Sequence, residues 1–138
     1  MFERILLAVD GSEPSRRAME AAAELAVGNG AEVLVLHVRE LDPRGRAGPV
    51  SLEEPGEAAD LVNGVVADLR GRGVKASGEA YAAVGGGAAP QIISAAKAFG
   101  AGLIVMGTRG SSDFAALLVG SVAHKVIHHA ECPVLVTR

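Results

Sequence analysis

Residues 103–121 read LIVMGTRGSSDFAALLVGS, a strand pattern followed by a glycine-rich connection. The run from Leu103 to Met106 is apolar at every position, which predicts a short strand covered on both faces of a sheet. Gly107 follows it directly, and Gly120 precedes a segment with helical spacing of its apolar residues. A fully covered strand that leads into a helix is typical of α/β proteins with a mostly parallel sheet.

The rest of the chain repeats this alternation of strands and helices. Apolar runs that predict further buried strands occupy residues 5–9, 33–36 and 134–136. Residues 74–80 alternate between apolar and polar side chains, which predicts a strand with one exposed face at the edge of the sheet. Apolar residues recur at helical spacing in four segments, which begin at Met19, Val62, Ile92 and Ala123. The order predicts an open, mostly parallel α/β sheet in one domain of 138 residues.

Residues at the predicted helix ends support this assignment. Ser12 is a suitable N-cap with Pro14 in the first turn of the helix that follows. Gly28 and Gly100 stand where two of the helices are predicted to end, because glycine readily adopts the left-handed conformation of a helix C-cap.

Composition and charge exclude several classes of protein. The 13 Lys and Arg against 16 Asp and Glu give a net charge of −3, and one Tyr with three Phe cannot form a base-stacking platform, so we expect no nucleic acid partner. The single cysteine, Cys132, excludes an intrachain disulfide and a multi-cysteine zinc site, and it is typical of a cytoplasmic protein. No apolar run reaches the roughly 18 residues of a membrane span, so we expect no membrane contact.

The connection from Gly107 to the last helix has the chemistry of a phosphate site. Gly107 and Gly110 allow positive φ and close approach of the backbone to a ligand, and successive N–H groups in such a turn can bind an anion. Gly120, Ser121 and Val122 open the last helix, where free N–H groups and the helix dipole favour phosphate. The spacing alone leaves open that these are ordinary turn glycines and that Ser121 is only an N-cap.

Asp10 follows the first strand. In a parallel sheet it therefore lies at the same edge as the start of the glycine connection. If the first and fourth strands are neighbours, Asp10 faces that connection across the position where ligands bind in open α/β sheets. An acid there suits ribose hydroxyls or base donors. No motif places a His or Lys partner beside Asp10, so we predict no catalytic residue.

Four segments together resemble the universal stress protein family over nearly the whole chain. They are ILLAVDGS at 5–12, VLVLHV at 33–38, GLIVMGTRG at 102–110 and GSVAHKVIHHAECPVLV at 120–136. The pattern G-x2-G-x9-G-[ST], formed by Gly107, Gly110, Gly120 and Ser121, matches the signature of the branch of the family that binds ATP. The resemblance implies a Rossmann-like sandwich: a five-stranded parallel sheet of order 3-2-1-4-5 with helices on both faces.

The resemblance also implies a set of nucleotide-binding residues. Asp10 would lie at the adenosine end, and the backbone of Val38 would meet adenine. The other residues of this set would surround ribose and phosphates: Gly107, Arg109 and Gly110 in the turn, and Gly120, Ser121 and Val122 at the helix start. Asp113 departs from the family pattern, since an acid near a triphosphate must either point to solvent or be bridged by a divalent cation such as Mg²⁺.

The resemblance implies a stress-response or regulatory protein that changes conformation with bound ATP and hydrolyses it slowly at most. Two alternatives stay open: an interaction module of the same fold that does not bind ATP or binds another small ligand, and a nucleotide-processing enzyme on this scaffold. Family members commonly dimerise through the last strand. Val134, Leu135 and Val136 form a short apolar strand after Pro133, which also favours an edge position and a homodimer.

Two weaker signals concern metals and redox chemistry. His124 and His128 have the i, i+4 spacing of metal ligands but no third ligand nearby in sequence, so we predict exposed histidines and no metal site. Cys132 is predicted to be a buried, inert thiol.

Overall fold

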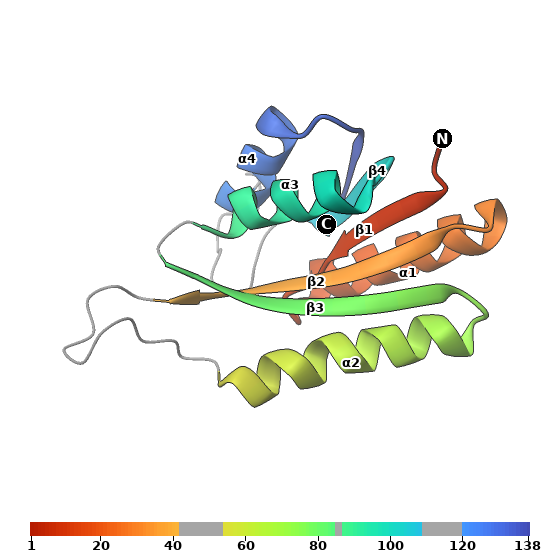
Figure 1. The fold of residues 1–138 in the computed structure, drawn as a ribbon, viewed down its shortest axis with the longest axis horizontal. Coiled ribbons are helices and arrows are strands. Elements are labelled where there is room, and N and C mark those ends of the chain that lie inside the picture. The colour runs from red at the N-terminus through yellow and green to blue at the C-terminus, as the bar shows by residue number, and fades with distance from the viewer. Residues whose placement is uncertain (42–53, 85–86, 109–119) are drawn as a thin grey trace.

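The computed structural model describes residues 1–41, 54–84, 87–108 and 120–138 (Figure 1). The described strands are β1 (Arg4–Ala8), β2 (Glu32–Leu41), β3 (Lys75–Val84), β4 (Leu103–Gly107) and β5 (Val134–Thr137). The described helices are α1 (Glu13–Asn29), α2 (Pro55–Gly71), α3 (Ala88–Phe99) and α4 (Ser121–His129). Strands and helices alternate along the described chain, as the sequence predicts.

The five strands form one parallel sheet of order β3-β2-β1-β4-β5. The central strand β1 pairs with β2 up to Ala8↔Leu36 and with β4 up to Leu7↔Val105. This confirms the predicted α/β fold and its strand order, and it makes β1 and β4 neighbours.

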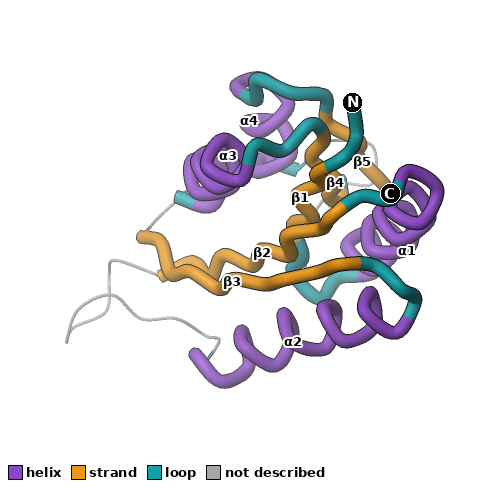
Figure 2. Tube along the Cα trace, turned by 45° about the vertical axis from the view of Figure 1, so that its right-hand side comes forward, coloured by secondary structure: helices purple, strands orange, loops and turns teal. Residues whose placement is uncertain are grey.

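Helices cover both faces of the sheet, with α1 and α2 on one side and α3 and α4 on the other (Figures 1 and 2). Successive side chains of a strand point to opposite faces, so β1 contributes to both layers. Ile5 and Leu7 pack in the core with α1 and α2, whereas Leu6 packs in the core with α3 and α4, and all three are fully buried. Burial on both faces explains why Ile5, Leu6 and Leu7 form an uninterrupted apolar run.

Helix α1 begins as predicted, but its C-cap lies two residues later than predicted. Ser12 is its N-cap, and the backbone N–H of Ser15 donates to Ser12 Oγ over 3.3 Å. The predicted end at Gly28 is wrong, because the helix continues to Asn29 and the C-cap is Gly30, which adopts the left-handed conformation at φ 63°. Gly100 ends α3 in the same conformation, as predicted.

Strand β3 lies at the edge of the sheet, as predicted, but continues to Val84. It pairs along its whole length with β2, which also runs past the predicted end of its apolar run. Gly78 lies where α2 packs on β3: a Cβ there would overlap Val62 and come within 2.9 Å of Val66 Cγ2. The glycine therefore lets the helix close onto the strand.

Candidate functional site

The candidate site lies at the carboxyl ends of β1 and β4, which are adjacent in the sheet. The chain leaves β1 towards α1 on one face and leaves β4 towards α4 on the other. Strand order reverses at this pair, and ligands of open α/β sheets bind at such a position. The condition left open by the sequence, that the first and fourth strands are neighbours, is therefore met.

Asp10 is held in a tight turn between β1 and α1. Its Oδ1 accepts hydrogen bonds from the backbone N–H of Ser12 at 2.9 Å and from Ser12 Oγ at 2.5 Å. Its own N–H donates to Ser15 Oγ at 3.0 Å, and Gly11 provides the turn with φ 81°. These bonds fix the direction of a half-buried carboxylate at the edge of the sheet.

His37 is a buried residue beside the site, and no role was predicted for it from the sequence. It follows the end of the β1–β2 ladder, where the N–H of Val9 donates to the carbonyl of Leu36 at 2.9 Å. His37 Nδ1 lies 2.6 Å from the carbonyl oxygen of Val9, so Nδ1 carries a proton and donates. The imidazole is 5% exposed and thus joins the turn of Asp10 to the strand that carries Val38. A lone histidine within the apolar run VLVLHV is the signal that could have found it.

Gly107 ends β4 directly against the first turn of α1. A Cβ at this position would lie 2.9 Å from the Pro14 carbonyl carbon and 3.0 Å from the nitrogen of Ser15. Among the described glycines, positive φ occurs at Gly11, Gly30, Gly73 and Gly100. The predicted positive φ at Gly107 is therefore wrong, and the missing side chain leaves room for the first turn of α1.

Gly120 ties the start of α4 to the end of β4. Its N–H donates to the carbonyl of Thr108 at 2.5 Å, and the N–H of Thr108 donates to the carbonyl of Thr137 at 2.6 Å. Gly120 is the buried N-cap of α4, so Ser121 is not the cap but the first helical residue, exposed to solvent. Val122 follows it, half-buried. The first N–H groups of a helix have no intrahelical partner, so this turn can donate to an anion.

Thr137 joins the two sides of the site from β5. Its Oγ1 donates to the carbonyl of Pro14 at 2.8 Å and lies 3.4 Å from the carbonyl oxygen of Met106. Arg17 adds a second link from α1, since its NH1 donates to the carbonyl of Arg138 at 2.6 Å. These contacts join the start of α1 to the ends of β4 and β5, and no local motif in the sequence indicated them.

The structure therefore brings part of the predicted set to one edge of the sheet. Asp10 and Gly107 both contact the first turn of α1, Gly120 is bonded to the end of β4, and Ser121 and Val122 begin α4. Val38 lies on β2, beside β1. Arg109, Gly110 and Asp113 fall outside the described residues.

The histidines of α4 and the described helices were the candidates for a metal site and for membrane contact. His124 and His128 are exposed, as predicted, with ring centroids 6.3 Å apart and nearly parallel planes. No group of three or more His, Cys, Asp or Glu side chains in the described part of the chain could hold a metal ion. None of the described helices has the length and hydropathy needed to cross a membrane.

Comparison with known proteins gives one consistent family. The model of the universal stress protein family matches residues 1–138. A universal stress protein of Thermus aquaticus is 38% identical over 141 residues, and the universal stress protein YxiE of Bacillus subtilis is 34% identical over 151 residues; both alignments cover 100% of each chain. The solved structure of the universal stress protein from Archaeoglobus fulgidus in complex with dAMP has a TM-score of 0.76 and 28% identity, again covering 100% of each chain.

Proposed function

The chain belongs to the universal stress protein family, and we propose that it binds an adenine nucleotide between the carboxyl ends of β1 and β4. The observation that carries this proposal is the presence at one edge of both the fixed carboxylate of Asp10 and the start of α4. A carboxylate suits ribose hydroxyls, and a helix N-terminus suits phosphate. The dAMP complex of the Archaeoglobus relative supports the same class of ligand.

Each part of the nucleotide has proposed partners. Asp10 accepts from the ribose or the base, and the backbone of Val38 contacts adenine. The phosphates are bound by the residues on either side of the β4–α4 connection and within it: Gly107, Arg109, Gly110, Gly120, Ser121 and Val122. Aromatic residues make up 3% of the chain, so adenine is held by backbone and aliphatic contacts rather than by stacking.

The proposed ligand is ATP, with Mg²⁺ as its counterion. The complete G-x2-G-x9-G-[ST] spacing supports a triphosphate, because its glycines and the helix start supply several backbone donors. Asp113 would help to hold Mg²⁺, which would neutralise part of the phosphate charge. The protein would act in the cytoplasm, in a stress response or regulatory role, through a conformation that depends on the bound nucleotide.

The proposed assembly is a homodimer that pairs along β5. This strand forms an edge of the sheet, and it exposes 37% of Leu135 beside the half-buried Val134 and Val136. An edge strand presents unpaired backbone groups that a second copy can satisfy. Sedimentation equilibrium tests this directly: we expect the mass of two chains, and the mass of one chain would contradict it.

The nucleotide proposal is tested by calorimetric titration of ATP, ADP, AMP and GTP, with and without Mg²⁺. We expect ATP to bind, Mg²⁺ to strengthen its binding, and GTP to bind more weakly. The Asp10→Asn variant should lose about tenfold in affinity, because it removes one charged hydrogen-bond acceptor. Asn keeps the oxygen that accepts from Ser12, so folding should be retained.

Asp60→Asn, which makes the same change at an exposed position of α2, is the matched control and should bind ATP normally. Absence of a thermal shift with ATP, ADP and AMP would overturn the proposal, since saturation at a hundredfold over Kd stabilises a protein by about 2.7 kcal/mol. That result would favour the interaction module without ATP.

A further inference from the structure

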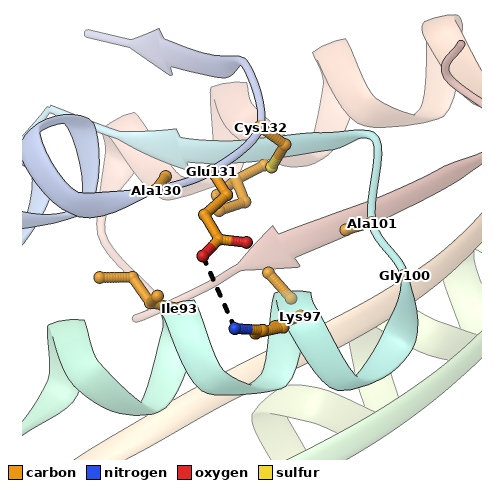
Figure 3. Close-up of a pocket in the computed structure, with 9 residues that line it drawn as sticks. Ile93, Lys97, Gly100, Ala101, Ala130, Glu131 and Cys132 are labelled. Atoms are coloured by element: carbon orange, nitrogen blue, oxygen red, sulfur yellow. Dashed lines mark ion pairs between the residues drawn. The ribbon is translucent and has the colours of Figure 1, made fainter.

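A pocket of about 300 Å³ lies at the amino ends of β4 and β5, at the edge of the sheet opposite the proposed nucleotide site. It is bounded by the last turns of α3 and by the connection from α4 to β5 (Figure 3). Small-molecule sites have volumes of roughly 300–1,000 Å³, so this pocket suits a ligand smaller than a nucleotide.

The inner part of the pocket is apolar. Ala96 and Ile104 are buried at 5% and 1% exposure, and Ile93 and Cys132 are half-buried. Burial raises the pKa of the Cys132 thiol, so at neutral pH this side chain is uncharged and behaves as a small apolar group. Cys132 is less buried than the sequence predicted, because the pocket opens beside it. This lining suits a short alkyl group.

One pair of opposite charges crosses the pocket. Lys97 Nζ on α3 lies 3.6 Å from Glu131 Oε1 on the α4–β5 connection, and Figure 3 shows the pair between the two walls. The two side chains are 74% and 76% exposed. An exposed ion pair contributes little to stability, so a ligand can separate these charges at small cost.

Two helices also end at this pocket. Gly100, the C-cap of α3, and Ala130, the C-cap of α4, are both among its lining residues. The C-terminal end of a helix carries partial negative charge, which favours a cation nearby. Both helix ends therefore favour a positive group of a ligand, for which Glu131 is the partner, whereas a negative group depends on Lys97 for its partner.

A ligand with a single charge would pair with one of these residues and displace the other from its partner. A zwitterion would pair with both. We propose that this pocket binds an aliphatic α-amino acid, with its ammonium group against Glu131, its carboxylate against Lys97 and its side chain on Ile104 and Cys132. This site is separate from the nucleotide site and does not depend on it.

The first test uses L-leucine as the probe and Cys132 as the reporter, because it is the only cysteine of the chain. L-leucine should slow alkylation of Cys132 by iodoacetamide in a saturable manner. It should also shift the amide NMR signals of Gly100 and Ala101. Glycine lacks the alkyl group, and 4-methylpentanoate and isoamylamine each lack one charge, so each should bind at least about tenfold more weakly.

The second test removes each charge in turn. Lys97→Ala and Glu131→Ala should each weaken L-leucine binding by about tenfold in the NMR titration. The matched controls are Lys125→Ala on α4 and Glu24→Ala on α1, which remove exposed charges elsewhere and should bind L-leucine normally. The proposal is overturned if L-leucine gives no saturable effect, if a singly charged analogue binds equally well, or if neither pocket variant loses affinity.

Discussion

Helices α1 and α4 both begin at the carboxyl edge of the sheet, but their first turns are completed in different ways. At the start of α1, neighbouring residues of the chain act as the partners of the helix end. Ser12 caps the helix and also bonds Asp10, and Glu13 supplies an acid in the first turn. The start of α4 has a glycine cap and no acid in its first turn, and within the described residues no side chain caps it. One helix start is therefore filled by the protein, whereas the other remains suited to an external anion.

The difference shows that helix polarity alone does not make a binding site. Both N-termini carry partial positive charge, yet at α1 the hydroxyl of Ser12 and the nearby acids already provide what an anion would provide. Gly107 and Thr137 hold the two regions together, since the first contacts the first turn of α1 and the second bonds Pro14.

The largest effect is expected at Gly107, where β4 meets the first turn of α1. Gly107→Val should lower the free energy of unfolding by about 3 kcal/mol, because the new side chain would overlap the backbone of Pro14 and Ser15. Urea denaturation measures this. Gly64→Ala is the control: a Cβ there would meet no described atom within 4 Å, and the change should stabilise α2 by up to about 1 kcal/mol. Equal effects of the two variants would contradict the packing assigned to Gly107.

A smaller effect is expected from removal of the α1 cap. Ser12→Ala should lower the free energy of unfolding by about 1 kcal/mol, because it deletes the oxygen that accepts from the N–H of Ser15. Urea denaturation again measures this. A loss below a few tenths of a kcal/mol would show that α1 does not rely on this cap.

The smallest effect on stability is expected at the corresponding exposed serine of α4. Ser121→Ala should change the free energy of unfolding by less than about 0.5 kcal/mol, because Ser121 is exposed and is not the cap. A loss as large as that of Ser12→Ala would remove the distinction between the two helix starts.

The sequence predicted the fold well because its signals are local. Uninterrupted apolar runs, the alternation at 74–80 and helical spacing identified the strands and helices, and the central position of β1 agrees with the full burial of Ile5, Leu6 and Leu7. The errors concern the positions at which helices and strands end, which a local pattern marks less well. Gly28 was the predicted end of α1, but Gly30 is the glycine that adopts the left-handed C-cap conformation. Strand β3 continues to Val84 because β2 continues as far as Leu41 and pairs with it there.

The candidate site was predictable only in part, for the same reason. Asp10 and Gly120 follow from strand ends and helix starts, which a sequence pattern marks. The bonds from His37 to Val9 and from Thr137 to Pro14 join residues that are 28 and 123 positions apart, so no local pattern indicates them. The packing of α1 against Gly107 is likewise not marked by a local pattern, and the contact of Gly107 with phosphates stays a prediction.

The central claim, that the start of α4 binds the phosphates of an adenine nucleotide, is tested most directly by an ATP titration of Ser121→Glu. A negative charge at this exposed first helical position should leave folding intact or stabilise α4 by about 0.3–1 kcal/mol through the helix dipole. It should also weaken ATP binding by more than about tenfold, through repulsion of the phosphates. Ser77→Glu, which adds the same charge at an exposed position of β3, should bind ATP like the original chain. Unchanged ATP affinity in Ser121→Glu would contradict the account.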